Sequence, residues 1–282
     1  MTGQSRVIHG DNLEVLATIP GGTVDLIYID PPFNTGRRQT RQRVKTTVSQ
    51  TGTRIGFSGR TYDTEVLGSR SYADTHDDFL GFVEPRLVEA FRVLAPTGAL
   101  YFHIDYREAH YCKVLLDRIF GRASFINEII WAYDYGARTT KRWPAKHDTI
   151  FFYAKDPDHY AFNAAEVDRE PYMAPGLAGP EKSARGKRPS DCWWHTIVPT
   201  NSREKTGYPT QKPEGIVRRM VAASSRPGGW CLDPFAGSGT LGSVCAKLGR
   251  RFVLIDSNAE AIAVTRARLE QAQPPLEIRR AS

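Results

Sequence analysis

The sequence predicts an α/β fold, with a doubly wound, mostly parallel sheet of about seven strands and an irregular inserted region. Three observations support this prediction. The chain has 282 residues, which suits one large domain or a domain with a smaller one embedded in it. Short apolar runs alternate with segments in which apolar residues recur every three or four positions, so strands alternate with helices. Several apolar runs end at Asp, Gly or Pro, as buried strands do where they leave a sheet.

The first clear strand is the apolar run 24–29, which ends at Asp30. Residues 37–60 contain seven Arg or Lys and no acid among many Gly, Ser and Thr, so we expect a basic loop there. Apolar residues then recur at helical spacing over 78–94, and Pro96 and Gly98 end this predicted helix. The remaining elements of this half are predicted as a strand at 99–104, a helix at 107–120, and strands at 126–131 and 149–153.

Regular spacing is lost from residue 156 to 206, where Pro, Gly and charged residues dominate. We interpret this stretch as an irregular insert and expect its two adjacent tryptophans, Trp193 and Trp194, to be local core. Regular elements return after it, as a helix at 213–224, a strand at 230–233, a helix at 240–248, a strand at 252–255 and a helix at 259–272. The chain therefore divides into 1–155, 156–206 and 207–282.

The composition is that of a globular protein with a mild basic excess. Hydrophobic residues make up 40% of the chain, charged residues make up 24%, and the formal net charge is +7. This charge is compatible with a polyanionic partner such as nucleic acid, and equally with a basic surface that binds nothing. The first residues contain no apolar run, no stretch of 18 apolar residues occurs, and the four cysteines lack metal-binding spacing. We therefore expect a cytoplasmic protein without a signal peptide, a membrane span or a structural metal.

A candidate cofactor motif lies in the segment 233–240, which follows a predicted strand and opens a predicted helix. Its glycines allow the backbone to turn tightly and approach a ligand, although a plain tight turn would look the same. The next strand ends at Asp256, 19 positions after Gly237, which suits a carboxylate that accepts hydrogen bonds from ribose hydroxyls. The third glycine of a dinucleotide motif is absent, which argues against NAD and favours S-adenosylmethionine. The candidate cofactor-binding residues here are Asp233, Phe235, Gly237, Ser238, Gly239, Thr240 and Asp256.

A candidate catalytic motif, Asp30-Pro31-Pro32-Phe33, lies at the predicted carboxyl end of the first strand, where open α/β sheets place ligands. An exocyclic base amine is a poor nucleophile because its lone pair is delocalised into the ring. If the Asp30 carboxylate and the Pro31 carbonyl accept its two hydrogens, the nitrogen turns towards tetrahedral geometry and the lone pair is freed. Pro32 helps to fix the direction of that carbonyl, and Phe33 offers a face for stacking an extruded base. The competing interpretation is a turn that only ends the strand.

Together these motifs resemble the β-group amino-methyltransferases of bacterial restriction–modification systems. In that group the catalytic motif precedes the recognition insert and the cofactor motif comes last, which is the order found here. Further matches follow the same order at 9–12, 103–107, 125–131, 146–149 and 208–213. The resemblance implies that Asp11 lies at the adenine end of the cofactor and that Thr210 and Lys212 line its methionine end. For Asp11 a simple turn residue is the alternative, and we expect His103 to shape the pocket wall.

The resemblance implies an S-adenosylmethionine-dependent methyltransferase fold and an enzyme that modifies DNA. Asp30 favours the N6 amine of adenine, because the branch that acts on the N4 amine of cytosine usually carries Ser at this position. Residues 1–155 would then form the catalytic half, 156–206 the target recognition region and 207–282 the cofactor-binding half. A methyltransferase for RNA or a small molecule is a more distant alternative, as is a non-catalytic DNA-binding relative.

The resemblance implies that the partner is double-stranded DNA. It also implies a protein of the bacterial cytoplasm that is associated with the nucleoid through DNA. A homodimer and a cognate restriction endonuclease are left open, as is the recognition sequence. Two basic stretches are candidate DNA-binding segments, because their cations would hold phosphates beside an extruded base; the alternative is a pair of solvated loops. The first consists of Arg37, Arg38, Arg41, Arg43 and Lys45, and the second of Arg138, Lys141 and Arg142.

Overall fold

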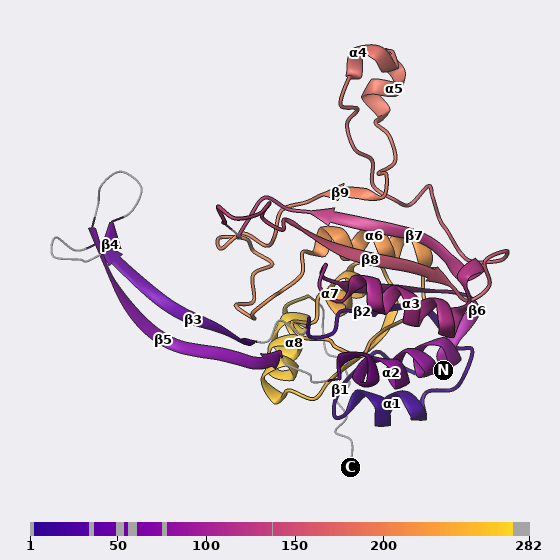
Figure 1. Cartoon of the computed structure of the whole chain (residues 1–282), viewed down its shortest axis with the longest axis horizontal. Helices are drawn as coiled ribbons and strands as arrows, with labels where there is room; N and C mark the ends of the chain where they lie inside the picture. Colours follow the sequence, from indigo (N-terminus) through magenta and orange to yellow (C-terminus); the bar gives the residue numbers. More distant parts are fainter. Residues whose placement is uncertain are drawn as a thin grey trace.

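An eight-stranded sheet forms the centre of the protein, with helices on both of its faces (Figure 1). The computed structural model describes residues 3–33, 37–48, 54–55, 61–74, 78–136 and 138–272, and along 37–48, 54–55 and 61–74 it describes the backbone. The strands lie in the order β1-β11-β10-β2-β6-β8-β7-β9. Their bounds are β1 Arg6–His9, β2 Val24–Ile29, β6 Leu94–Ile104, β7 Phe125–Ala132, β8 His147–Ala154, β9 Cys192–Trp194, β10 Trp230–Asp233 and β11 Arg251–Asp256.

The sheet is parallel from β1 to β6, and β8 and β7 continue it in antiparallel pairs. At the far edge β9 lies parallel to β7. The predicted α/β fold with a doubly wound, mostly parallel sheet is therefore confirmed, with eight strands in place of the seven expected. The two edge strands, β1 and β9, have only four and three residues, which is too short to show a period in the sequence.

The central strands are buried on both faces, because successive side chains of a strand point to opposite sides of the sheet. In β2, Ile27 and Ile29 belong to the core formed with α1, α2 and α3, whereas Leu26 and Tyr28 belong to the core formed with α6, α7 and α8. The helices are α1 Asn12–Thr18, α2 Phe79–Val93, α3 Ala109–Phe120, α4 Pro175–Ala178, α5 Pro180–Arg185, α6 Glu214–Ser224, α7 Thr240–Lys247 and α8 Ala259–Ala272, with a short 3-10 turn at Arg122–Ser124.

The segment 37–60 is not simply a loop, which corrects the expectation for it. β3 (Arg37–Val48) and β5 (Thr61–Asp74) form a long antiparallel hairpin, and the short β4 (Arg54–Ile55) pairs with β5. The hairpin extends away from the eight-stranded sheet (Figure 1). The sequence did not reveal it because β3 contains only two apolar residues, Val44 and Val48, and so shows no alternation.

The insert 156–206 contains few regular elements, namely α4, α5 and β9. The first two form a small helical projection that stands off the sheet (Figure 1). Trp193 is buried as expected, but Trp194 is 77% exposed, so the expectation that both are core is wrong for Trp194. Neighbouring side chains on a strand point to opposite faces, so this edge strand buries only one of the pair. None of the helices in the described part of the chain is long and apolar enough to cross a membrane.

Candidate active site

Three carboxyl side chains stand next to one another where parallel strands end. β11, β10 and β2 are neighbours; Asp256 ends β11, Asp233 ends β10, and Asp30 directly follows β2. A cavity of about 360 Å³ opens at these ends. Its wall contains all four predicted catalytic residues and every predicted cofactor-binding residue except Gly239. Motifs that are 200 residues apart in the sequence therefore meet in one pocket, at the edge where open α/β sheets place ligands.

The cofactor loop, residues 233–240, turns through two glycines with positive φ. These are Gly237, at 51°, and Gly239, at 71°. A Cβ on Gly239 would lie 2.7 Å from the side chain of Thr265, so this glycine is required for the close approach of the loop to α8. The Thr265 hydroxyl donates to the Gly237 carbonyl at 3.1 Å. Gly239 is therefore a packing residue behind the loop, and the face towards the cavity is formed by its neighbours.

Asp256 accepts two backbone hydrogen bonds at the rim of the cavity. The N–H groups of Gly237 and Asn258 donate to its two carboxylate oxygens, each at 2.8 Å. Burial raises the pKa of Asp256, and these two N–H groups counteract part of the rise. A carboxylate oxygen has two lone pairs, so each oxygen can accept a further hydrogen bond from a ligand.

Asp233 is the most buried of the three carboxyl groups, with 3% of the residue exposed. Burial raises its pKa well above the ordinary value; the N–H of Phe235 opposes this at 2.9 Å, and the charges of Asp30 and Asp256 add to it. The charges of Asp30 and Asp256 oppose ionisation of Asp233, whereas a nearby cation such as Lys212 favours it.

Asp30 is paired with Lys212, whose ammonium donates to both carboxylate oxygens at 2.7 and 2.6 Å. The same ammonium lies 4.5 Å from the centre of the Phe33 ring. Lys212 therefore contacts the candidate catalytic carboxylate and the candidate stacking surface at once. The sequence indicated only that it lines the methionine end of a cofactor.

Behind Asp30 lies a buried hydrogen-bonded chain that the sequence did not reveal. The Tyr28 hydroxyl lies 2.8 Å from Nδ1 of His103, and Nε2 of His103 lies 3.2 Å from Asp148. Asp148 also accepts from the Tyr133 hydroxyl at 3.0 Å. His103 is fully buried behind Tyr28 and does not line the cavity, so the expectation that it shapes the wall is wrong.

The partners of His103 hold its ring in place on both sides. Burial raises the pKa of Asp148, but hydrogen bonding to His103 and its charge lower it more, so Asp148 is ionised and can only accept. Burial, followed by the nearby carboxylates, raises the pKa of Tyr28 well above its ordinary value, so its hydroxyl stays protonated. An ionised Asp148 can only accept, so His103 donates to it from Nε2, while the Tyr28 hydroxyl lies against Nδ1, which is 3.9 Å from Asp30.

The opening segment of the chain contributes one wall of the cavity. Asp11 is the N-cap of α1, where it accepts from the N–H groups of Leu13 and Glu14 at 2.8 and 3.2 Å. It lines the cavity as well, so the two alternatives for this residue are compatible. Arg86 of α2 is a wall residue that the sequence did not indicate, because it sits in an ordinary helical pattern; its guanidinium donates to Asn12 at 2.6 Å.

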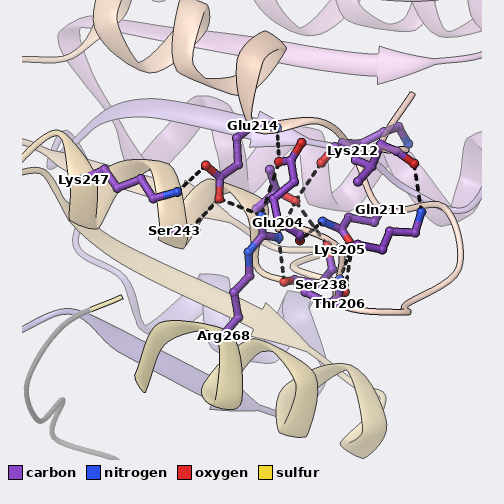
Figure 2. Close-up of polar contacts among 12 residues, drawn as sticks. Glu204, Lys205, Thr206, Gln211, Lys212, Glu214, Ser238, Ser243, Lys247 and Arg268 are labelled. Atoms are coloured by element: carbon purple, nitrogen blue, oxygen red, sulfur yellow. Dashed lines mark hydrogen bonds and ion pairs between the residues drawn. The ribbon is translucent and has the colours of Figure 1, made fainter. Parts of the chain in front are cut away.

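The loop that carries Lys212 has a fixed and strained shape. Among the residues that the structure describes, Thr210 is the only non-glycine with positive φ, at 56°. Its neighbour Gln211 accepts from the N–H of Thr206 at 2.8 Å and donates to the Glu204 carbonyl at 2.6 Å (Figure 2). Such strain costs about 1–3 kcal/mol and persists only where surrounding contacts hold it, commonly at functional sites.

Arg268 of α8 connects this loop to the cofactor loop (Figure 2). Its guanidinium donates to the Ser238 carbonyl, the Thr240 hydroxyl and the Glu214 carboxylate, at 3.2, 3.0 and 2.8 Å. The Thr240 hydroxyl in turn donates to the Lys212 carbonyl at 3.1 Å. Arg268 therefore supports both loops from behind, although no motif in the sequence pointed to it.

The candidate DNA-binding residues fall into two groups. Arg138, Lys141 and Arg142 are exposed in the connection between β7 and β8. The side chains of Arg37, Arg38, Arg41, Arg43 and Lys45 lie outside the described part of the structure, although the backbone of all five forms β3. The structure therefore shows side-chain exposure only for Arg138, Lys141 and Arg142.

The residues of the cavity fit an adenosine-bearing cofactor. A volume of about 360 Å³ lies within the range of roughly 300–1,000 Å³ of small-ligand pockets. Asp256 offers free lone pairs for ribose hydroxyls at one strand end, and the glycine loop brings backbone close to a ligand. A cation beside Asp233 favours its ionised form, and the positive charge of a sulfonium would act in this way.

A doubly wound sheet with a pocket at the carboxyl ends of its strands is the architecture of α/β proteins that bind nucleotide-like cofactors. Residues 24–267 match the N6/N4 methyltransferase family, described as DNA methylase, and the chain belongs to this family. It is 30% identical to the type II methyltransferase M.HpaI of Haemophilus parainfluenzae, over 94% of this chain and 74% of that protein. It is also 30% identical to the DNA adenine methyltransferase YhdJ of Escherichia coli K12, over 94% and 83% of the two chains.

Solved structures share the fold. The cytosine-N4-specific PvuII DNA methyltransferase superposes with a TM-score of 0.64 at 14% identity, over 95% of this chain and 87% of that one. The M1.HpyAVI–SAM complex superposes with a TM-score of 0.59 at 19% identity, over 94% and 98%. At 14% and 19% identity, these superpositions show a shared fold and nothing more specific.

Proposed function

We propose that this DNA methylase transfers a methyl group from S-adenosylmethionine to the N6 amine of adenine in double-stranded DNA. The observation that carries the proposal is the single cavity whose wall joins Asp30, Pro31, Pro32 and Phe33 to the cofactor loop. Methyl donor and acceptor must approach to about 3–3.5 Å before they react. One continuous cavity, bounded by both motifs, allows that approach.

S-adenosylmethionine supplies an electrophilic methyl group when bound. Asp30 accepts one hydrogen of the target amine and the Pro31 carbonyl accepts the other, which returns the lone pair to the nitrogen. Asp30 then takes up the proton that the methylated nitrogen releases. Its carboxylate has room for about four hydrogen bonds, so it can keep Lys212 as a partner while it accepts from the amine. Phe33 stacks on the extruded base.

The cofactor is held by the residues that line the other part of the cavity. Asp256 accepts from the ribose hydroxyls with the lone pairs that Gly237 and Asn258 leave free. Asp11 lies towards the adenine, and Thr210 lies towards the methionine end with its backbone held in a fixed shape. The other residues assigned to the cofactor are Lys212, Asp233, Phe235, Ser238 and Thr240.

Adenine is favoured over cytosine by the Asp at position 30, since Ser usually marks the cytosine-N4 branch. The relative YhdJ is named as a DNA adenine methyltransferase, and it covers 94% of this chain. The alternative substrate is the N4 amine of cytosine, because the cytosine-N4-specific PvuII enzyme shares the fold. The mechanism at Asp30 is the same for either base.

Residues 156–206 form the target recognition region in this proposal, between a catalytic half at 1–155 and a cofactor-binding half at 207–282. The exposed cations Arg138, Lys141 and Arg142 hold DNA phosphates. The basic strand β3 directly follows the catalytic motif in sequence, and its five cations serve the same purpose.

The test compares wild-type protein with Asp30→Ala on plasmid DNA and S-adenosylmethionine. DNA is digested to nucleosides and examined by mass spectrometry. We expect N6-methyladenine from the wild type and no methylated nucleoside from the variant, which still binds cofactor and DNA because Asp30 acts mainly in the transition state.

Each outcome has a separate meaning. N4-methylcytosine from the wild type would overturn the base assignment and keep the mechanism. Full activity of Asp30→Ala would overturn the mechanism. Phe33→Ala is expected to keep measurable activity and to raise KM for DNA, because it removes stacking and leaves the acceptors of the amine hydrogens in place.

A further inference from the structure

One large aromatic side chain stands almost fully in solvent on a basic loop. Trp143 is 93% exposed, in the connection 133–146 between β7 and β8. The exposed residues Arg138, Lys141 and Arg142 precede it, and the sequence 138–146 contains no acid. Tryptophan is highly buried on average, so an indole that is 93% exposed departs from the usual environment of this residue.

The strand registers fix where this loop lies. β2 and β6 are parallel, with Ile29 opposite Phe102, so the end of β6 lies on the same edge as Asp30. β8 is antiparallel to β6 and β7 is antiparallel to β8, so β7 ends and β8 begins at that same edge, with Ala132 opposite His147. The loop therefore stands at the edge of the sheet that carries the candidate catalytic carboxylate, and the β3–β5 hairpin departs from this edge too (Figure 1).

The base of the loop is held, while Trp143 projects from it. The Tyr133 N–H donates to the Lys146 carbonyl at 2.9 Å, and the Lys146 ammonium pairs with Asp134 at 3.2 Å. Further along, Arg142 donates to the hydroxyl of Tyr106, which follows β6, at 3.3 Å. Trp143 directly follows Arg142, so the hydrogen bond from Arg142 to Tyr106 holds the neighbouring backbone near the end of β6. The ring of Trp143 itself is exposed.

An enzyme that acts on an exocyclic amine must take the base out of the duplex and must pay for the lost stacking. A flat aromatic ring that enters the gap replaces part of that stacking, and nearby cations neutralise the flanking phosphates. Trp143 combines these properties: a large flat ring, neighbouring cations and a position at the catalytic edge.

We propose that Trp143 inserts into the DNA duplex in the place that the target base leaves, with Arg138 and Lys141 on the flanking phosphates. This inference rests on the proposed function, since only a base-extruding enzyme leaves such a gap. The matched control is Tyr111, an aromatic residue on α3 that is 64% exposed and lies outside the cavity and the candidate DNA-binding stretches.

The experiment uses a duplex that carries the modified site, as located by sequencing of DNA methylated by the wild-type protein. Methyl transfer is measured for the wild type, Trp143→Ala, Trp143→Phe and Tyr111→Ala. The same measurement is repeated on a duplex in which the target base is mispaired, because a mispaired base costs less to extrude. Dissociation constants for S-adenosylmethionine report whether each variant is folded at the cofactor site.

Trp143→Ala is expected to lower kcat/KM on the paired duplex roughly 5- to 150-fold, the range that corresponds to one lost stacking contact. On the mispaired duplex we expect most of this loss to disappear. Trp143→Phe should lie between alanine and the wild type, and Tyr111→Ala should match the wild type. An equal loss on both duplexes, or wild-type activity of Trp143→Ala, would overturn the insertion. Absence of methyl transfer by the wild type on any DNA would overturn the proposed function instead.

Discussion

Lys212 donates to both oxygens of Asp30, so its position bears on catalysis as directly as on cofactor binding. We expect Lys212→Met to lower kcat by about 10- to 150-fold, since a hydrogen bond to a charged group contributes about 1.5–3 kcal/mol. The loss follows because an unpaired Asp30 is free to rotate away from the amine. Steady-state kinetics at saturating cofactor and DNA measure it.

The control for this variant is Lys113→Met, which breaks a similar ion pair with Asp117, at 2.7 Å on α3. This residue lies outside the cavity, so activity should match the wild type. If Lys212 instead serves the cofactor alone, its variant would raise the dissociation constant of S-adenosylmethionine and leave kcat unchanged. That result would remove the assignment of Lys212 to the catalytic carboxylate.

Asp256 accepts hydrogen bonds from two backbone N–H groups and is assigned to the ribose hydroxyls of the cofactor, and one substitution can separate these two roles. Asp256→Asn keeps an oxygen acceptor for one of the N–H groups of Gly237 and Asn258 and removes the charge. We expect it to weaken S-adenosylmethionine binding by about 1–3 kcal/mol, through loss of charge-assisted hydrogen bonds to the ribose. Calorimetric titration measures the affinity, and thermal unfolding shows whether the loop remains intact. Unchanged affinity in a folded variant would contradict the assignment.

At the scale of elements, the basic strand β3 is the clearest case for an electrostatic test. If its cations hold phosphates, replacing Arg37, Arg38 and Arg41 by Gln should flatten the salt dependence of DNA binding. Each lost phosphate contact should lower the slope of log K against log salt by about 0.9. Fluorescence anisotropy with labelled duplex at several salt concentrations measures the slope. A slope equal to that of the wild type would show that these side chains do not contact DNA.

The elements that the sequence predicted correctly are those that bury a face. The helix expected at 78–94 is α2, at Phe79–Val93, and the strand expected at 230–233 is β10 with the same bounds. Each of them packs against the sheet or within it, so burial imposes a period that the sequence must carry. The strands β3 and β5 belong to a separate sheet, and the polar sequence of β3 shows no alternation, so it predicted a loop.

The residues of the candidate site also divide into those that the sequence could predict and those that it could not. Residues in a linear motif, such as Asp30 and Gly237, could be found because the local backbone and the chemistry need neighbours at fixed spacing. Arg268 and Arg86 could not, because each acts through contacts with residues distant in sequence, and the hydrogen-bonding partners of His103 could not be found for the same reason. The order of the sheet and the packing of the helices bring those partners together, and sequence spacing does not encode either.

At the scale of the whole molecule, the acidic edge of the sheet links stability to pH. Burial raises the pKa of Asp233 well above its ordinary value, and Asp30 and Asp256 add to the rise. In the unfolded chain an Asp titrates near ~3.9. As the pH rises above that value the unfolded state loses this proton while the folded state still holds it, so the free energy of unfolding falls until the folded carboxyl also ionises.

Asp233→Asn removes this proton and keeps a carbonyl oxygen that can accept the Phe235 N–H. Without cofactor, we expect the variant to be more stable than the wild type above pH 4, with a difference that grows by up to ~1.4 kcal/mol per pH unit and then levels off. Urea unfolding at pH 5, 6, 7 and 8 measures it, and Glu128→Gln, at an exposed position, is the control. A difference that stays constant between pH 5 and 8 would contradict the proposal that the folded state holds this proton in that range. A bound cation should shrink the difference, because it favours the ionised carboxyl, so titration with S-adenosylmethionine at pH 8 should bring the wild type closer to the variant.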